Sequence, residues 1–154
     1  MSTAKTTFVY VTYIRSTPEK IFEAIMKPEA TRQYWGHENV SDWRPGSKWE
    51  HVRDNEARPV NIAGTVVENT PPKRLVMTWA SPSDFSDASK HSRVTFDLEP
   101  FNDMVKLTVT HDELEEGSGM ARGISKGWPI VLSSLKSFLE SGRPLDVFAQ
   151  PKAS

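Results

Sequence analysis

The chain has 154 residues, of which 37% are hydrophobic and 25% charged, the size and balance of a single compact soluble domain. Its net charge of -1 gives no field to recruit nucleic acid, and the absence of cysteine excludes disulfides, a thiol nucleophile and thiolate metal ligands. No apolar run approaches the roughly 20 residues of a membrane span, and residues 1–7 lack the apolar core of a signal peptide. We therefore expect one cytoplasmic domain, residues 1–154, with a core at about 7–143 and flexible ends at 1–6 and 144–154.

The N-terminal third predicts one strand and two short helices. Residues 8–14 are aromatic and β-branched, which is typical of a strand. A helix is predicted to follow, because Thr17 can cap free amides and Pro18 suits the first helical position. Pro28 interrupts this helix and begins a second short one that extends to about Tyr34.

The middle of the chain predicts antiparallel strands separated by turn residues. The predicted strands are residues 39–43, 48–53, 60–68, 74–79, 94–99 and 105–110. Alternation along the last strand directs His111 towards the interior and Asp112 away from it. The polar segments 81–90 and 113–126 are predicted to be mobile and to border the mouth of a pocket.

The segment 127–142 predicts a long amphipathic helix. Its apolar side chains, from Trp128 to Leu139, recur at helical spacing, whereas Ser134 is placed on the opposite, polar face. Pro129 leaves two possibilities open, because the helix either begins there or continues from an earlier start. An apolar stripe of this width needs a partner surface, and the strands supply one.

The order of elements predicts an α+β domain in which a curved antiparallel sheet wraps around the long C-terminal helix, with two short helices after the first strand. A curved sheet that grips a helix often leaves a cavity between the two. The sequence thus supports a pocket more strongly than it identifies what fills the pocket.

Short sequence features distributed along the chain match one known family in order and spacing. They are Ile14-Arg15 with 18–22, 28–31 with Tyr34-Trp35, 64–67, 71–75 with Thr78-Trp79, Thr110-His111, and 127–129 with 135–136 and 139–140. Over roughly residues 7–143 the chain resembles the activator of heat-shock protein 90 ATPase homologues, within the START-like superfamily, also called SRPBCC or helix-grip. The resemblance implies a helix-grip fold with an elongated cavity, in which relatives hold lipids, hormones, polyketides or other apolar molecules. The co-chaperone that names the family resembles this chain only in its C-terminal domain.

Ten residues are predicted to bind a ligand by lining the cavity. They are Trp35, Trp49, Met77, Trp79, Phe96, Val109, His111, Trp128, Leu132 and Leu135. The alternative is that the same side chains interdigitate in a solid core. His111 has two interpretations. In the functional one, the inward imidazole orients a ligand or acts as a base; in the structural one, it only forms hydrogen bonds within the protein.

No metal or cofactor is expected. The four histidines, His37, His51, His91 and His111, lie on separate predicted elements, and no two have the close spacing of zinc ligands. We therefore expect no metal site and no organic cofactor.

The favoured function is binding of a small apolar or amphipathic molecule under the C-terminal helix, with residues 81–90 as a gating loop. The first alternative is a cofactor-free enzyme of the cyclase or isomerase type with His111 as base. The second is a protein-interaction module of co-chaperone type, which requires a filled core and an exposed patch. Neither nucleic acid nor an integral membrane contact is expected, and a protein partner is left unidentified.

Overall fold

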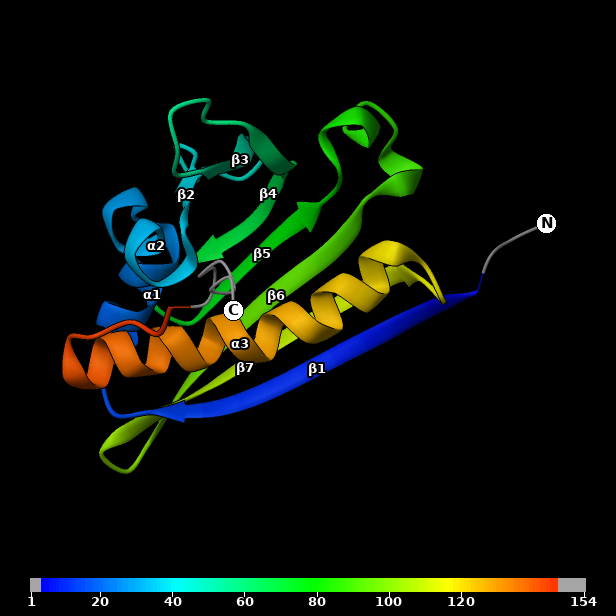
Figure 1. Cartoon of the computed structure of the whole chain (residues 1–154). Helices are drawn as coiled ribbons and strands as arrows, with labels where there is room; N and C mark the ends of the chain where they lie inside the picture. The colour runs from blue at the N-terminus through cyan, green and yellow to red at the C-terminus, as the bar shows by residue number, and fades with distance from the viewer. Residues whose placement is uncertain (1–3, 147–154) are drawn as a thin grey trace, which may run out of the picture.

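The computed structural model describes residues 4–146, and its seven strands form one antiparallel sheet in the order β1-β7-β6-β5-β4-β3-β2. Figure 1 shows this sheet curving around the long helix α3 (Gly119–Ser141). The strands are β1 (Lys5–Ile14), β2 (His37–Val40), β3 (Lys48–Arg53), β4 (Val60–Thr70), β5 (Arg74–Trp79), β6 (Ser92–Phe101) and β7 (Met104–Glu115). The predicted α+β helix-grip fold is confirmed, and the sheet is open rather than closed into a barrel.

The two short helices, α1 (Pro18–Met26) and α2 (Pro28–Trp35), follow β1 as predicted. The side chain of Thr17 accepts a hydrogen bond from the amide of Lys20, which satisfies one of the free donors at the start of α1. The second helix ends at Gly36, whose φ of 71° lies in the left-handed region that glycine tolerates. Both helices lie at one end of the sheet (Figure 1).

The hairpin of β6 and β7 fixes which side chains face the helix. Phe101 pairs with Met104 across a turn in which Asn102 has a φ of 54°, as tight hairpin turns require. From this turn the alternation of the two strands directs one set of side chains under α3, and His111 belongs to that set because it is fully buried.

Helix α3 resolves the question raised by Pro129, because it starts at Gly119 and continues through the proline. Ser118 caps it by accepting from the amide of Ala121. The segment 113–126, which was predicted to be mobile, contains the end of β7, a short connection at 116–118 and the first two turns of α3. None of the described helices is long and apolar enough to cross a membrane.

Ser134 does not face solvent as its polarity suggested. It is fully buried, because its hydroxyl donates to the carbonyl of Leu145 at 3.2 Å and accepts from the amide of Leu145 at 3.0 Å. This buried serine of α3 therefore anchors the segment that follows the helix. At the other end β1 begins at Lys5, inside the segment 1–6 that was expected to be flexible. Of the ends predicted to be flexible, residues 1–3 and 147–154 lie outside the described part of the chain.

Candidate functional site

Four tryptophans meet under the N-terminal half of α3. The ring centre of Trp79 lies 5.5 Å from both Trp49 and Trp128 and 6.5 Å from Trp35. Trp35 and Trp128 are 5.4 Å apart, so the four rings form one continuous cluster. Such separations and tilts are typical of favourable aromatic pairs. The expectation that these tryptophans converge agrees with their positions.

All ten residues predicted to line a cavity are buried, with exposed fractions between 0% and 6%. Phe96 and His111 touch the tryptophan cluster, at 5.8 Å and 6.2 Å from the ring of Trp128. The other four, Met77, Val109, Leu132 and Leu135, lie in the same hydrophobic core. These residues are therefore brought together in the interior.

The buried indole N–H groups differ in their hydrogen bonds. Trp49 donates to the carbonyl of Thr78 at 2.7 Å, and Trp128 donates to Nδ1 of His111 at 3.1 Å. The indole nitrogen of Trp79 is buried without any partner among the described residues. A buried donor left without an acceptor costs free energy and calls for an explanation.

His111 is held at both ring nitrogens. Because an indole N–H can only donate, Nδ1 of His111 must accept from Trp128, and the ring proton is then on Nε2. Nε2 donates to the hydroxyl of Ser92 at 2.7 Å, and this hydroxyl donates to the carbonyl of Trp79 at 3.0 Å. Burial lowers the pKa of His111 to about 4, against a small raising effect of Asp112. The geometry thus favours a neutral, structural imidazole over a base that is free to act on a ligand.

Trp79 lies at the wall of a cleft of about 750 Å³. The cleft opens at the end of the sheet where the loop between β5 and β6 approaches the first turn of α3 (Figure 1). Its lining residues are Lys5, Trp79, Ser81, Asp84, Ser89, Lys90, Ser92, Glu113, Leu114, Glu115, Ser118 and Met120. Of the ten residues predicted to line a cavity, only Trp79 is among them. The cleft is therefore a different space from the one that the ten residues were expected to enclose.

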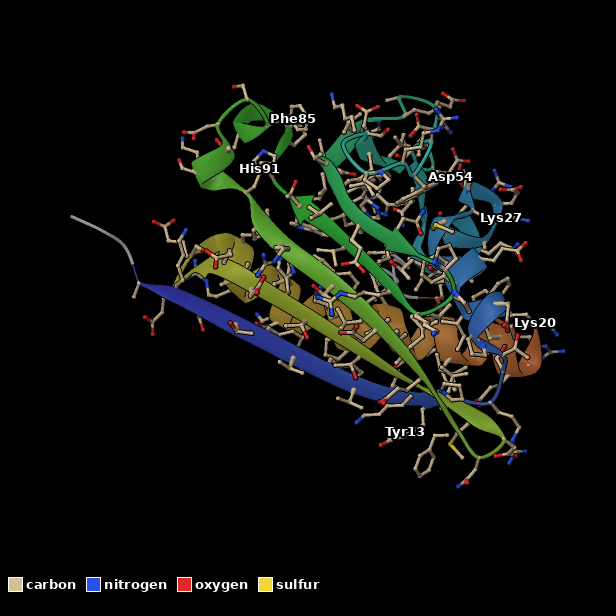
Figure 2. All side chains as sticks on the ribbon, turned by 180° about the vertical axis from the view of Figure 1, so that it is seen from behind. Tyr13, Lys20, Lys27, Asp54, Phe85 and His91 are labelled. Atoms are coloured by element: carbon tan, nitrogen blue, oxygen red, sulfur yellow. The ribbon has the colours of Figure 1, made fainter. Side chains whose placement is uncertain are left out.

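The loop between β5 and β6 contains two short 3-10 helices, η1 (Pro82–Asp84) and η2 (Ala88–Lys90). His91, which Figure 2 labels beside Phe85, fixes this loop. Its Nε2 donates to the carbonyl of Phe85 at 2.8 Å, so Nδ1 accepts from the hydroxyl of Thr78, also at 2.8 Å. The ammonium of Lys48 lies 4.5 Å from the centre of the Phe85 ring and adds a second contact.

Part of the lining of this cleft lies in segments that were predicted to border a pocket. Both polar segments that were expected to border a pocket mouth contribute lining residues, from Ser81 to Lys90 and from Glu113 to Met120. Ser92 was missed although the alternation of β6 places it on the same face as Phe96. Lys5 was missed because the first strand was expected to begin three residues later.

His37 and His51 stack in parallel, with ring centres 4.2 Å apart. Nδ1 of His51 donates to the side-chain oxygen of Asn39 at 2.6 Å, because the amide nitrogen of Asn39 is bound to the carbonyl of Ile25. Burial lowers the pKa of His51 well below its ordinary value, and the neighbouring His37 lowers it further. Within residues 4–146 no three potential ligand side chains gather as a metal site would require.

A second depression, of about 490 Å³, lies at the opposite end of the molecule, beside α1. Its lining residues are Glu19, Phe22, Glu23, Met26, Lys27, Pro28, Trp43, Pro71 and Pro72. Small-molecule sites usually combine an apolar wall with a few inward polar groups. The lining of the cleft at Trp79 is mostly polar, but it includes a residue, Trp79, whose buried N–H has no partner among the described residues, so this cleft is the candidate site.

Comparison with known proteins places the chain in a family. The family model described as "Activator of Hsp90 ATPase homolog 1-like protein" matches residues 15–140. No curated protein matches the sequence.

Solved structures share the fold at low sequence identity. The Aha1 dimer from Colwellia psychrerythraea is 22% identical, with a TM-score of 0.73 over 89% of this chain and 98% of that chain. ChR145 from Cytophaga hutchinsonii is 25% identical, with a TM-score of 0.72 over 92% of this chain and 98% of that chain. CalU16 from Micromonospora echinospora is 18% identical, with a TM-score of 0.68 over 88% of this chain and 77% of that chain. These similarities support the fold and leave the function to be argued from the site.

Proposed function

Because the chain belongs to the family of activator of Hsp90 ATPase homolog 1-like proteins, whose fold serves ligand binding and polyketide cyclisation, we propose that it binds a small amphipathic molecule in the cleft at Trp79. The ligand enters between the loop of η1 and η2 and the first turn of α3. No catalytic step is part of this proposal, since both nitrogens of His111 are engaged within the protein.

One observation carries the proposal. The side chain of Trp79 is 94% buried (6% exposed) and lines the cleft, and its N–H has no acceptor within the described part of the chain. An oxygen of a bound molecule would satisfy this donor and recover the free energy that its burial costs.

The chemistry of the cleft limits the ligand class. Leu114 and Met120 offer apolar contacts, and the indole of Trp79 offers an aromatic edge with a single donor. An aromatic or alicyclic compound with a carbonyl, sulfonyl or hydroxyl oxygen fits these groups. For the other nine residues predicted to bind ligand, direct contact stays a prediction, and in this proposal they hold Trp79 in place.

Native mass spectrometry of the purified protein and a thermal-shift screen of fatty acids, flavonoids, sterols and aromatic polyketides test for binding of this kind. A co-purified molecule or stabilisation by one chemical class supports the proposal. The proposal fails if nothing co-purifies and no class raises the melting temperature.

A titration with dansylamide, a neutral fluorescent naphthalene sulfonamide, tests the site itself. Trp79→Phe keeps an aromatic ring and removes the N–H, so we expect the affinity for dansylamide to fall about tenfold. Trp43→Phe is the matched control, because it changes a tryptophan in the second depression and leaves the cleft intact. Equal affinities of wild type and Trp79→Phe, or a loss confined to Trp43→Phe, would contradict the proposal.

A second candidate function is a protein-interaction module, favoured by the apolar side chains on the outer face of β1. Val9, Val11 and Tyr13 are 55%, 42% and 40% exposed, and Phe101 packs against Tyr13 at 5.5 Å. None of the described helices covers this face of the sheet (Figure 2). If this function is correct, Val11→Lys should weaken the binding of a protein partner without changing the binding of dansylamide. The ligand-binding proposal expects that Val11→Lys changes neither kind of binding.

A further inference from the structure

We infer that the ligand of this cleft carries a protonated amine, which Glu113 binds while Trp79 holds an oxygen of the same molecule. The inference rests on the proposed function, because it specifies the chemistry of the same site. It follows from the backbone at Glu113, from the charges around the cleft and from the unpaired donor.

Glu113 lies in a β-bulge near the end of β7. Thr6 lies opposite Leu114 and Phe8 opposite His111, so β7 has one residue more than β1 between these pairs. Glu113 adopts a φ of 57°, a conformation that is unfavourable for a residue with a Cβ. The bulge directs Glu113 to the wall of the cleft and leaves its backbone strained. Strained backbone conformations of this kind are found preferentially at binding sites.

Among the charged side chains that line the cleft, one carboxylate remains without an opposite charge. Lys90 forms an ion pair with Asp84 at 3.5 Å, and Lys5 lies directly opposite Glu115 in the ladder of β1 and β7. Glu113 forms no ion pair with any residue between 4 and 146. One positive charge on the ligand would balance this carboxylate.

Arg93 does not supply that charge. Its guanidinium donates to both carboxylate oxygens of Asp112, at 3.2 Å and 2.8 Å. Asp112 is accordingly the main cause of the raised pKa of Arg93, and Glu113 contributes least. The fork of Arg93 is therefore committed to a bidentate pair with its neighbour across the strands.

The unpaired indole distinguishes this site from an ordinary acidic surface. A carboxylate at the surface is common, but it is rare for the same cleft to be lined also by a residue whose buried N–H has no partner among the described residues. Leu114 and Met120 line the same cleft and offer apolar contact. The ligand is thus an apolar body with a hydrogen-bond acceptor at one end and an ammonium group at the other.

Three probes that share one ring system separate the charge from the ring. Dansylcadaverine carries a protonated amine, dansylamide is neutral, and dansylaminohexanoate carries a carboxylate. We expect wild type to bind dansylcadaverine about three- to tenfold more tightly than dansylamide and dansylaminohexanoate most weakly, with a preference that shrinks as salt is added.

Two variants of Glu113 test its role, and a neighbouring glutamate is the control. Glu113→Gln keeps the size of the side chain and should abolish the preference for the amine. Glu113→Gly should abolish it as well while the melting temperature stays the same or rises, because glycine accepts the left-handed conformation. Glu116→Gln changes an exposed glutamate outside the cleft lining and should keep the preference.

The outcomes separate this inference from the function on which it rests. If Trp79→Phe weakens all three probes but wild type does not prefer the amine, the cleft binds ligand and the inference is wrong. A preference that survives in Glu113→Gln also overturns the inference. If none of the probes binds, both the inference and binding of this ring class at the cleft are contradicted.

Discussion

Trp49 and Trp79 are neighbours in the same cluster, 5.5 Å apart, yet their surroundings differ. The indole N–H of Trp49 is bound to the carbonyl of Thr78, and Gly64 packs directly beneath this bond. The indole N–H of Trp79 is buried without a partner among the described residues, and Trp79 lines a cleft whose wall also contains the strained Glu113. The region around Trp49 is optimised for stability, whereas the region around Trp79 retains two unfavourable features that a ligand could compensate.

The largest effect should come from closing the space beneath Trp49. In Gly64→Ala the new Cβ would lie 2.0 Å from the carbonyl oxygen of Thr78 and 2.5 Å from the indole nitrogen of Trp49. Backbone and ring must both move, so we expect a loss of about 3 kcal/mol or more in the free energy of unfolding, measured with urea. Gly123→Ala is the control, because it meets no atom within 4 Å in α3 and should be neutral or stabilising. A Gly64→Ala protein as stable as wild type would show that the packing at Trp49 is loose.

Acid should destabilise the protein through the histidine between the two regions. Burial lowers the pKa of His111 to about 4, so between that value and its ordinary 6.5 the unfolded chain binds a proton that the folded chain does not. Stability present at pH 7 is therefore lost as the pH falls from about 6.5 towards 4, by at most about 3 kcal/mol from this residue. Burial of His51 acts in the same direction.

His111→Gln isolates this contribution, because glutamine can accept from Trp128 and donate to Ser92 without titrating. Unfolding free energies at pH 7 and pH 4.5 should differ less in the variant than in wild type. An unchanged difference would mean that His111 is not the group that takes up the proton.

Replacement of Trp49 and of Trp79 should lower the stability of the protein by different amounts, an effect of moderate size. Replacement by phenylalanine removes the N–H and some ring volume at both positions. Only Trp49→Phe leaves a buried acceptor, the carbonyl of Thr78, without its donor. We expect Trp49→Phe to cost about 1–3 kcal/mol more than Trp79→Phe in thermal or urea unfolding of the ligand-free protein. Equal costs would indicate that the N–H of Trp79 is as well satisfied as that of Trp49.

The smallest effect concerns Glu113. Glu113→Gly removes the strain of the left-handed backbone conformation, which stabilises the folded protein, but glycine also has greater freedom in the unfolded chain, which opposes this gain. The free energy of unfolding should therefore rise by about 0–1 kcal/mol. Differential scanning calorimetry measures this change. Glu116→Gly is the control, because Glu116 has no positive φ and its replacement by glycine should lower the stability. A clear destabilisation by Glu113→Gly would contradict the account of a strained residue at the cleft.

Local patterns were sufficient to predict the fold. The cap at Thr17, the inward phase of His111 and the apolar stripe of α3 each follow from spacing along the chain, and the structure agrees with all three. The start of α3 was left open, because Pro129 fits either the first turn or the interior of a helix and residues 113–126 are rich in polar groups and glycine, which are typical of loops. Ser134 was misplaced because its burial depends on Leu145, a partner that helical periodicity does not include.

The site was predicted less well, and the reason is physical. Hydrophobicity predicts which side chains are buried, and all ten residues predicted to line a cavity are in the interior. It does not predict whether a buried N–H finds an acceptor, which separates Trp79 from Trp49 and Trp128. Nor does it predict the bulge that brings Glu113 to the cleft, because this depends on the register of β1 against β7.

The central claim is that the indole N–H of Trp79 is free for a ligand. Nitrogen-15 NMR of the five tryptophan indoles during a dansylamide titration tests it directly, with Trp79→Phe to assign the resonance. We predict that the Trp79 indole proton moves downfield most strongly, while those of Trp49 and Trp128 move less because their hydrogen bonds are already made. A Trp79 resonance that stays unchanged at saturating dansylamide would contradict the account.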